Sequence, residues 1–206
     1  MNPALAHRYL RRLGFGSWPA PTLETLFHLH RRHVERVAYE NLDIQLGRAT
    51  TVWPAESAER IAAGRGGYCF HLNGAFAALL DALGYAVTIH RGQVKKVPDP
   101  PAGVTFANHL ALTVACEGRE WFVDVGLGDG IHAPVPLRPG GFRQGPFRYA
   151  LRTAPDGWRF VHDRRGSFTA MDFETDPAEL DDFTEAHRIL STGPDSTFVR
   201  HFIVMR

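Results

Sequence analysis

Cys69 is the strongest candidate for a reactive residue in this sequence, because it ends the stretch GRGGYC at the predicted start of a helix. A thiol at a helix N-terminus lies at the positive end of the helix dipole, which lowers the pKa of the thiol and favours the thiolate. Free cysteine is also one of the most buried residue types, so a packing role is the alternative.

A nucleophilic thiol needs a base, and the base needs a group that orients it. The stretch NHLALTVACEGREWFVDVGLG predicts a hairpin that turns at Glu117 and Gly118. A two-residue turn places His109 and Asp124 on one face as diagonal neighbours, roughly 7–8 Å apart between Cα atoms. A three-residue turn would put them on opposite faces. The sequence therefore predicts a triad in which the Asp124 carboxylate orients the His109 imidazole toward Cys69.

The pattern of apolar residues changes near Gly84 and divides the chain into a helical and a strand-rich part. Spacings of three and four predict helices within 21–39, 54–64 and 69–83. Thr22 is the expected cap of the first helix, and Gly84 has the left-handed position that ends the third. Alternation with a period of two then predicts antiparallel strands. Helices followed by antiparallel strands indicate the fold class α+β.

Three further elements are expected in the C-terminal part of the chain. The stretch FRYALRTAPDGWRFVHD predicts a second hairpin that turns at PDG. A short late helix is expected with Asp176 as its cap and Pro177 at its first position. The final run, STFVRHFIVMR, predicts a strand that either pairs back onto the preceding strands or is cut short at Arg206.

Composition excludes several classes of partner. The chain has 206 residues, of which 44% are hydrophobic and 22% charged, as expected for one large or two small globular domains. A net charge of +1 gives no reason to expect a nucleic acid or a membrane as partner. No apolar run approaches the roughly 20 residues of a membrane span, and the first residues lack the pattern of a secretory signal. Two cysteines are too few for a disulfide framework, so we expect a cytoplasmic protein with reduced thiols.

Four stretches, AYENLD, RGGYC, NHLALTV and FVDVGLGDG, resemble those of the arylamine N-acetyltransferases, of an actinobacterial type, over nearly the whole chain. The resemblance implies that acetyl-CoA donates an acetyl group to Cys69, with His109 as base and Asp124 as orienting group, and that an arylamine or hydrazine nitrogen then accepts it. The two glycines before Cys69 would then let the acyl donor approach the backbone closely, and no metal is implied. The implied architecture is a helical bundle over 1–84 and a β-barrel over 85–206 with a papain-like core, and the usual third lid segment is not expected in this chain.

The resemblance also assigns residues to the pocket. Tyr39 would face the acetyl group, and its hydroxyl would shift the amine preference. Glu40 and Arg65 resemble a buried support pair near the thiol, the alternative for Glu40 being a solvated helix end. His71, where the family more often has an acidic or amide residue, would perturb the thiolate or point to solvent.

Four residues are implied to contact coenzyme A. Thr105 and Phe106 fall where the loop of the family meets the coenzyme, although Phe106 replaces a common glycine. Gly126 and Gly128 would let the pantetheine arm approach the backbone. The sequence holds no Walker-type phosphate loop.

Other functions remain alternatives. The amide synthases of the same family use the same triad to close macrolactams, and they would need a wider pocket around Tyr39. A truncated homologue that binds CoA without turnover, a papain-like protease, and a zinc site of Cys69, His71 and His109 are further possibilities. The HRRH stretch at 30–33 is interpreted as a solvated helix face, and Cys116 as a strand-end residue without chemistry.

Overall fold

The computed structural model describes residues 1–97 and 101–206. The α-helices are α1 (Pro3–Leu13), α2 (Leu23–Arg36), α3 (Leu42–Gln45), α4 (Pro54–Ala62), α5 (Cys69–Ala82), α6 (Thr184–Thr192) and α7 (Thr197–Arg200), with a 3₁₀ turn, η1 (Leu180–Phe183), before α6. The strands are β1 (Tyr39–Glu40), β2 (Ala86–Lys95), β3 (His109–Cys116), β4 (Arg119–Val123), β5 (Val135–Pro136), β6 (Gly140–Gln144), β7 (Phe147–Ala154), β8 (Gly157–Val161), β9 (Ala170–Glu174) and β10 (Val204–Met205).

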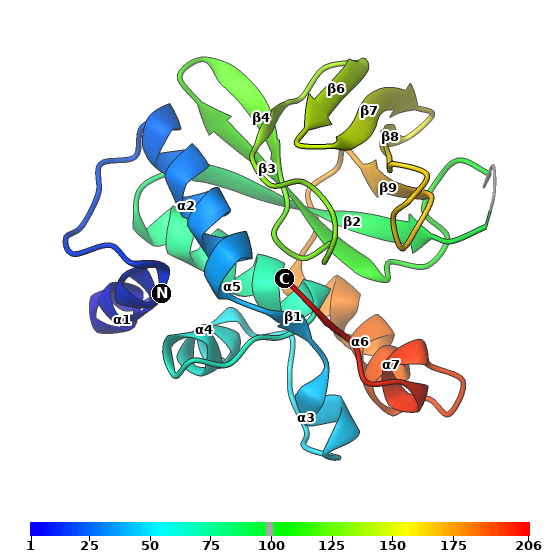
Figure 1. Ribbon diagram of the computed structural model, residues 1–206, viewed down its shortest axis with the longest axis horizontal. Helices are drawn as coiled ribbons and strands as arrows, with labels where there is room; N and C mark the ends of the chain where they lie inside the picture. Colours follow the sequence, from blue (N-terminus) through cyan, green and yellow to red (C-terminus); the bar gives the residue numbers. More distant parts are fainter. Residues whose placement is uncertain (98–100) are drawn as a thin grey trace.

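Eight strands form one curled antiparallel sheet in the order β5-β4-β3-β2-β9-β8-β7-β6. The helices cover the face of the sheet near β2 and β3, and the sheet curls away from them at its β6 end (Figure 1). The α+β class is therefore confirmed, with the barrel realised as a curled half-barrel. β10 pairs with β1 in a separate two-stranded sheet beside the helices.

The helical boundaries follow the local signals in the sequence. Thr22 caps α2, and its hydroxyl accepts a hydrogen bond from the Thr25 amide at 3.2 Å. Gly84 ends the α5 turn with φ of 95°, a left-handed conformation that favours glycine. α1 and α3 were not predicted, although Asn2 caps α1 through its side chain and a proline follows it.

The first hairpin has the predicted register. Glu117 and Gly118 have φ of 50° and 72°, so both central residues of the turn are left-handed, as a two-residue turn between twisted strands requires. Ala115 consequently pairs with Glu120, and Cys116 is confirmed as the last residue of its strand. The second predicted hairpin is also present, as β7 and β8.

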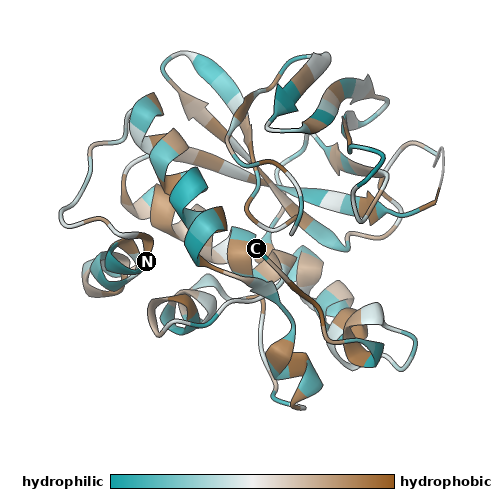
Figure 2. Cartoon of the chain, viewed as in Figure 1, coloured by the Kyte–Doolittle hydropathy of each residue, from teal (hydrophilic) through white to brown (hydrophobic). Residues whose placement is uncertain are grey.

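Helix α5 is the centre of the molecule. It packs against α4 on one side and against β2 and β3 on the other, and its apolar residues lie within the layer between helices and sheet (Figure 2). Phe70, Phe76, Leu79 and Leu80 are fully buried there. A second apolar cluster fills the concave part of the sheet, where Phe122 stacks on Phe173 at 5.3 Å between ring centroids. No helix in the described part of the chain is long and apolar enough to cross a membrane.

The predicted helix start at Pro177 is wrong. Residues 177–179 are not helical, because the Ala178 amide donates a hydrogen bond to the Ile89 carbonyl of β2 and ties this segment to the sheet. A capping box of Glu179 and Asp182 instead begins η1, and α6 follows.

The prediction of a long final strand is also wrong. Ser196 caps the short helix α7, and only Val204 and Met205 form a strand. Asn41 holds this segment: its amide donates to the Phe198 and His201 carbonyls, at 2.6 and 2.8 Å, and its side-chain oxygen accepts from the Ile203 amide. The chain therefore pairs with β1 rather than with the large sheet.

The HRRH stretch of α2 is only half solvated. Arg31 and Arg32 are exposed as interpreted, but His30 and His33 are fully buried. His33 Nε2 forms a hydrogen bond with the Tyr9 hydroxyl at 2.7 Å. Burial lowers the pKa of His30 to about 4 and that of His33 to about 3, because a charged imidazolium would lose its hydration.

These two histidines predict acid sensitivity of the fold. The unfolded chain takes up protons as the pH falls below 6.5, whereas folded His30 stays neutral until about pH 4 and folded His33 until about pH 3. The free energy of unfolding should therefore fall below pH 6.5, by up to about 1.4 kcal/mol per pH unit and histidine. Urea denaturation between pH 7.5 and 4.5 measures this. A His33→Gln variant should have a flatter profile, and His28→Gln, at an exposed position of α2, should keep the wild-type slope. Equal slopes in all three proteins would contradict the assignment.

Candidate active site

The two glycines before Cys69 are required by close packing, Gly66 against the residue before β1 and Gly67 against the first turn of α5. A Cβ at Gly66 would lie 2.1 Å from the Ala38 carbonyl oxygen, and one at Gly67 would lie 2.6 Å from the His71 Cβ. The Glu40 amide donates a hydrogen bond to the Gly67 carbonyl at 2.9 Å, which joins this turn to β1. The glycines thus fix the entry into α5, whereas the sequence analysis assigned them to the approach of an acyl donor.

Cys69 is the first residue of α5, as predicted, and its side chain is 4% exposed. Its Sγ donates a hydrogen bond to the Asn108 carbonyl at 3.5 Å. Asn108 directly precedes β3 and is itself held by β2, since its side chain accepts from the Val94 amide at 2.8 Å. The thiol of the helix therefore meets the residue that leads into His109.

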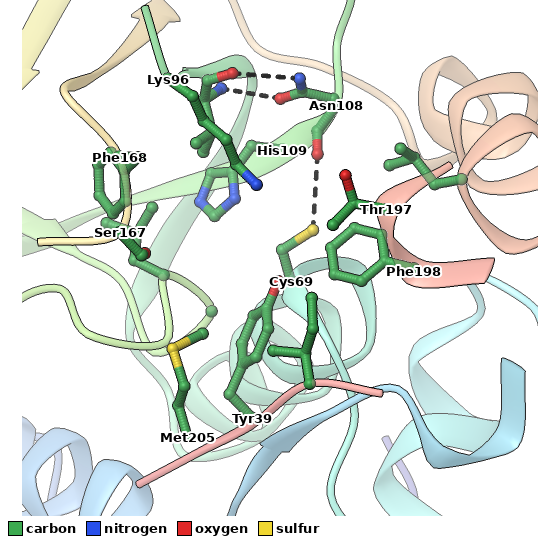
Figure 3. Close-up of a pocket in the computed structure, with 15 residues that line it drawn as sticks. Tyr39, Cys69, Lys96, Asn108, His109, Ser167, Phe168, Thr197, Phe198 and Met205 are labelled. Carbon is green, nitrogen blue, oxygen red and sulfur yellow. Dashed lines mark hydrogen bonds between the residues drawn. The ribbon is translucent and has the colours of Figure 1, made fainter. Parts of the chain in front are cut away.

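His109 is the first residue of β3 and Asp124 directly follows β4, and their side chains point toward each other. His109 Nε2 donates to Asp124 Oδ2 at 2.7 Å, and both side chains are about 1% exposed. The hairpin register predicted from the two-residue turn brings them together. The other ring edge of His109 faces the cavity that holds Cys69 (Figure 3).

Asn73 is a functional residue that the sequence analysis missed. Its Nδ2 donates to Asp124 Oδ1 at 2.9 Å and to the Leu110 carbonyl at 2.7 Å, and its Oδ1 accepts from the Val125 amide at 2.9 Å. The available signal was its spacing, because a residue four positions after Cys69 lies on the same face of the helix. Asn73 thereby joins the cysteine helix to β3 and to the segment that directly follows β4.

The carboxylate of Asp124 has a full set of donors. Besides His109 and Asn73, the Gly126 amide donates a hydrogen bond to Oδ1 at 2.9 Å. The backbone carbonyl of Asp124 accepts a separate hydrogen bond from His30 Nε2 at 2.9 Å. A Cβ at Gly126 would lie 2.9 Å from Cys69 Cα and from Asn73 Nδ2. Glycine is therefore required here by the packing of the site itself.

The electrostatics favour a charged imidazole. Burial alone lowers the pKa of His109, but the negative charge and hydrogen bond of Asp124, together with the Cys69 sulfur, outweigh it and raise the pKa to about 10. At neutral pH the imidazolium form is thus the stable one. An imidazolium beside a thiol stabilises the thiolate form of that thiol.

Cys69 and His109 open into a cavity of about 360 Å³. Tyr39 and Gly126 line it, as predicted for the pocket, together with Phe198 and Met205 of the C-terminal segment. In Figure 3, Phe198 lies to the right of the thiol, Tyr39 and Met205 lie below it, and His109, Ser167 and Phe168 lie to its left. The cavity is thus a mainly apolar space with a thiol and an imidazole at its base.

Glu40 and Arg65 form an ion pair of 3.7 Å between Nη2 and Oε1. Glu40 is buried in β1, where it accepts hydrogen bonds from the Leu42 and Gly66 amides, so a solvated helix end is excluded. Arg65 lies closer to Asp43, at 3.0 Å. The pair braces the turn that leads into Cys69.

Thr105 and Phe106 do not line the cavity. The Thr105 amide and hydroxyl both donate to the Gln93 side chain, at 2.9 and 3.2 Å, and Phe106 packs against the helical core. Gly128 has φ of 74°, and a Cβ there would lie 2.4 Å from Met205 Cε. Of the four residues assigned to coenzyme A, the structure brings only Gly126 to the cavity.

His71 is buried and does not point to solvent. Its Nδ1 accepts a hydrogen bond from Arg60 Nη2 at 3.0 Å, and burial lowers its pKa. His71 does not line the cavity of Cys69 and His109, which removes one ligand from the zinc alternative. Within residues 1–97 and 101–206, no group of three or more histidine, cysteine or acidic side chains could hold a metal ion.

Comparisons with known proteins agree on one family. A family model described as N-acetyltransferase matches residues 22–206. The arylamine N-acetyltransferase of Escherichia coli (strain K12) is 30% identical over 210 residues, which cover 100% of this chain and 74% of that protein. The proansamycin X synthase of Amycolatopsis mediterranei (strain S699) is 31% identical over 194 residues, 90% of this chain and 73% of that protein. A structure of Mycobacterium marinum arylamine N-acetyltransferase in complex with CoA has a TM-score of 0.85 at 30% identity, over 97% of this chain and 76% of that one.

The geometry predicts how the thiol reacts. Asp124→Asn removes the charge that raises the pKa of His109, so the imidazole becomes neutral at pH 7 and Cys69 loses its stabilising cation. Alkylation of Cys69 by iodoacetamide at pH 7 should slow at least about tenfold. The rate is measured by mass spectrometry in a Cys116→Ser background, with Asp81→Asn, at an exposed position of α5, as the control. Equal rates in Asp124→Asn and the control would show that the carboxylate does not activate the thiol.

Proposed function

The chain belongs to the arylamine N-acetyltransferase family, and from this premise we propose that it moves an acetyl group from acetyl-CoA to an arylamine or hydrazine nitrogen through an acetyl-Cys69 intermediate. The observation that carries the proposal is the buried hydrogen bond of 2.7 Å between His109 and Asp124, at the base of the cavity that Cys69 also lines. A nucleophile, a base and an orienting group are the three parts that covalent acyl transfer needs.

In the first half-reaction the Cys69 thiolate attacks the carbonyl carbon of the thioester. A bond between Sγ and that carbon forms, the bond to the coenzyme sulfur breaks, and the departing thiolate takes the proton of the His109 imidazolium. The raised pKa of His109 supports this starting state. Asp124 and Asn73 hold the ring in one orientation while its charge changes.

In the second half-reaction the amine nitrogen attacks the acetyl carbon of acetyl-Cys69. Neutral His109 accepts the proton that the nitrogen releases, and the bond from the carbon to Sγ breaks, which restores the thiolate beside an imidazolium. The first half-reaction consumes the thiolate and the imidazolium proton, and the second restores both. Donor and acceptor therefore use the same site in turn. This order is a ping-pong mechanism.

The cavity supports a small aromatic acceptor. Its volume of about 360 Å³ lies at the lower end of the range for ligand pockets, and the Tyr39 and Phe198 rings line it with their centroids 6.5 Å apart. The amide synthase alternative gains weight from the proansamycin X synthase relative, but it would need a wider pocket around Tyr39. We therefore favour the arylamine acceptor, in a cytoplasmic enzyme that uses no metal.

The proposed intermediate is directly testable by intact mass. Wild-type protein mixed with acetyl-CoA should gain one acetyl group, Cys69→Ala should gain none, and an arylamine should discharge the adduct. Cys116→Ser serves as the matched control and should be acetylated like the wild type. Wild-type protein without an adduct, with a thiol that still reacts with iodoacetamide, would contradict the proposed donor. An adduct that water discharges as fast as an amine would support a non-transferring homologue.

Tyr39 is expected to affect which acceptor the enzyme prefers and not the reactivity of Cys69. Tyr39→Phe removes only the hydroxyl, so acetylation of Cys69 by acetyl-CoA should stay within about twofold of wild type. The ratio of kcat/KM values for a hydroxyl-bearing arylamine and aniline should change by at least about threefold, as expected when one polar contact is lost. Steady-state kinetics with both acceptors measure the ratio. An unchanged ratio would place the acceptor away from Tyr39.

A further inference from the structure

A second cavity adjoins the catalytic one and is lined by basic side chains. This cavity, of about 320 Å³, is lined by Lys96, Arg152, Arg159, Arg164 and the loop 166–169, and we name it the basic groove. Lys96, Ser167 and Phe168 line both cavities. The groove therefore begins at the wall of the catalytic cavity, beside His109 (Figure 3).

The positive charge of the groove is not balanced within the fold. Asp172 is buried between Lys95, at 2.8 Å, and Arg159, at 2.6 Å, and Asp163 is paired with Arg165 at 2.9 Å. Among the described residues, Asp163 is the one acidic residue that lines the groove, and the Asp129 carboxylate beside it accepts hydrogen bonds from the Ser167 amide and hydroxyl at 2.7 and 2.8 Å. Lys96, Arg152 and Arg164 are exposed, and their side chains make no hydrogen bond or ion pair with the described part of the chain. Three like charges on one groove repel one another unless an anion binds there.

Lys96 connects the two cavities. It follows the last residue of β2, and Figure 3 shows its side chain extending into the catalytic cavity on the same side as His109. Among the described residues it is the one lysine or arginine that lines the catalytic cavity. Positively charged side chains therefore extend from the catalytic cavity, where Lys96 lies, to Arg152 and Arg164 in the basic groove.

We propose that the basic groove binds the phosphates of the acyl-CoA donor, an inference that rests on the proposed function. The thioester of such a donor must reach Cys69, and its phosphates lie at the other end of a flexible arm, so they need a site outside the catalytic cavity. Ser167 and Phe168 form the wall that the arm would follow. Three cations suit several phosphates better than the single carboxylate of an acidic acceptor.

This location differs from the one that the resemblance implies. Thr105 forms hydrogen bonds with Gln93, Phe106 packs on the helical core, and neither residue lines the cavity. The groove lies instead on β7, β8 and the segment that leads into β9. The groove residues therefore assign the recognition of the donor to the large sheet of this chain.

Binding of CoA itself, measured by titration calorimetry, tests the assignment without turnover. Arg152→Ala and Arg164→Ala should each raise the Kd for CoA about fivefold, and adenosine 3′,5′-bisphosphate should lose affinity in parallel. Arg32→Ala removes the same charge from an exposed position of α2 and should leave both Kd values within twofold of wild type. The difference between groove and control variants should shrink in 0.5 M salt.

Two further measurements separate the possible failures. Acetylation of Cys69 by p-nitrophenyl acetate, a donor without phosphates, should proceed at the wild-type rate in both groove variants. Unchanged Kd values for CoA in both groove variants would overturn the inference while leaving acetyl transfer intact. The inference would also be overturned if the only effect of the groove variants were a higher KM for 4-aminobenzoate with an unchanged KM for aniline, because the groove would then bind an acidic acceptor. Wild-type protein that neither donor acetylates would instead overturn the proposed function.

Discussion

The hydrogen bond between His109 and Asp124 is the interaction on which the site depends. A carboxylate at 1% exposure is costly unless donors surround it, and breaking a buried ion pair costs about 3–5 kcal/mol. Three donors meet the Asp124 carboxylate, from β3, from α5 and from its own strand end. Each of these elements must therefore keep its place for the charge to stay buried.

Two local features of the chain, a turn and a close glycine contact, hold these elements in place. The left-handed turn at Glu117 and Gly118 sets the register of β3 and β4, so His109 and Asp124 share a face. The close contact of Gly66 with β1 sets the start of α5. Asn73, one helical turn after Cys69, connects α5 to the β3–β4 hairpin. A local turn, a local glycine contact and one amide thus position three side chains that lie 40 and 15 residues apart along the chain.

Local signals predicted more of this protein than long-range ones. The starts of α2, α4 and α5, both hairpins and the facing of His109 and Asp124 could be predicted, because caps, turns and periodicity determine them within a few residues. The end of the chain could not be predicted. The partner of Val204 and Met205 is β1, more than 160 residues away, and the strand-like composition of the last run says nothing of that distance. The burial of His30 and His33 was not predicted for the same reason, because their hydrogen-bond partners are Asp124, far along the chain, and Tyr9 of α1.

The most direct test of the account is the protonation state of His109. Nuclear magnetic resonance of protein with ¹⁵N-labelled histidine follows both ring nitrogens of each imidazole through a pH titration, and an Asp124→Asn sample assigns the signals of His109. The account predicts that His109 is an imidazolium at neutral pH and loses its proton only near pH 10, and that it titrates well below this value once the carboxylate is gone. A His109 that is neutral at pH 7.5 in the wild-type protein would contradict the buried ion pair and the activated thiol that depends on it.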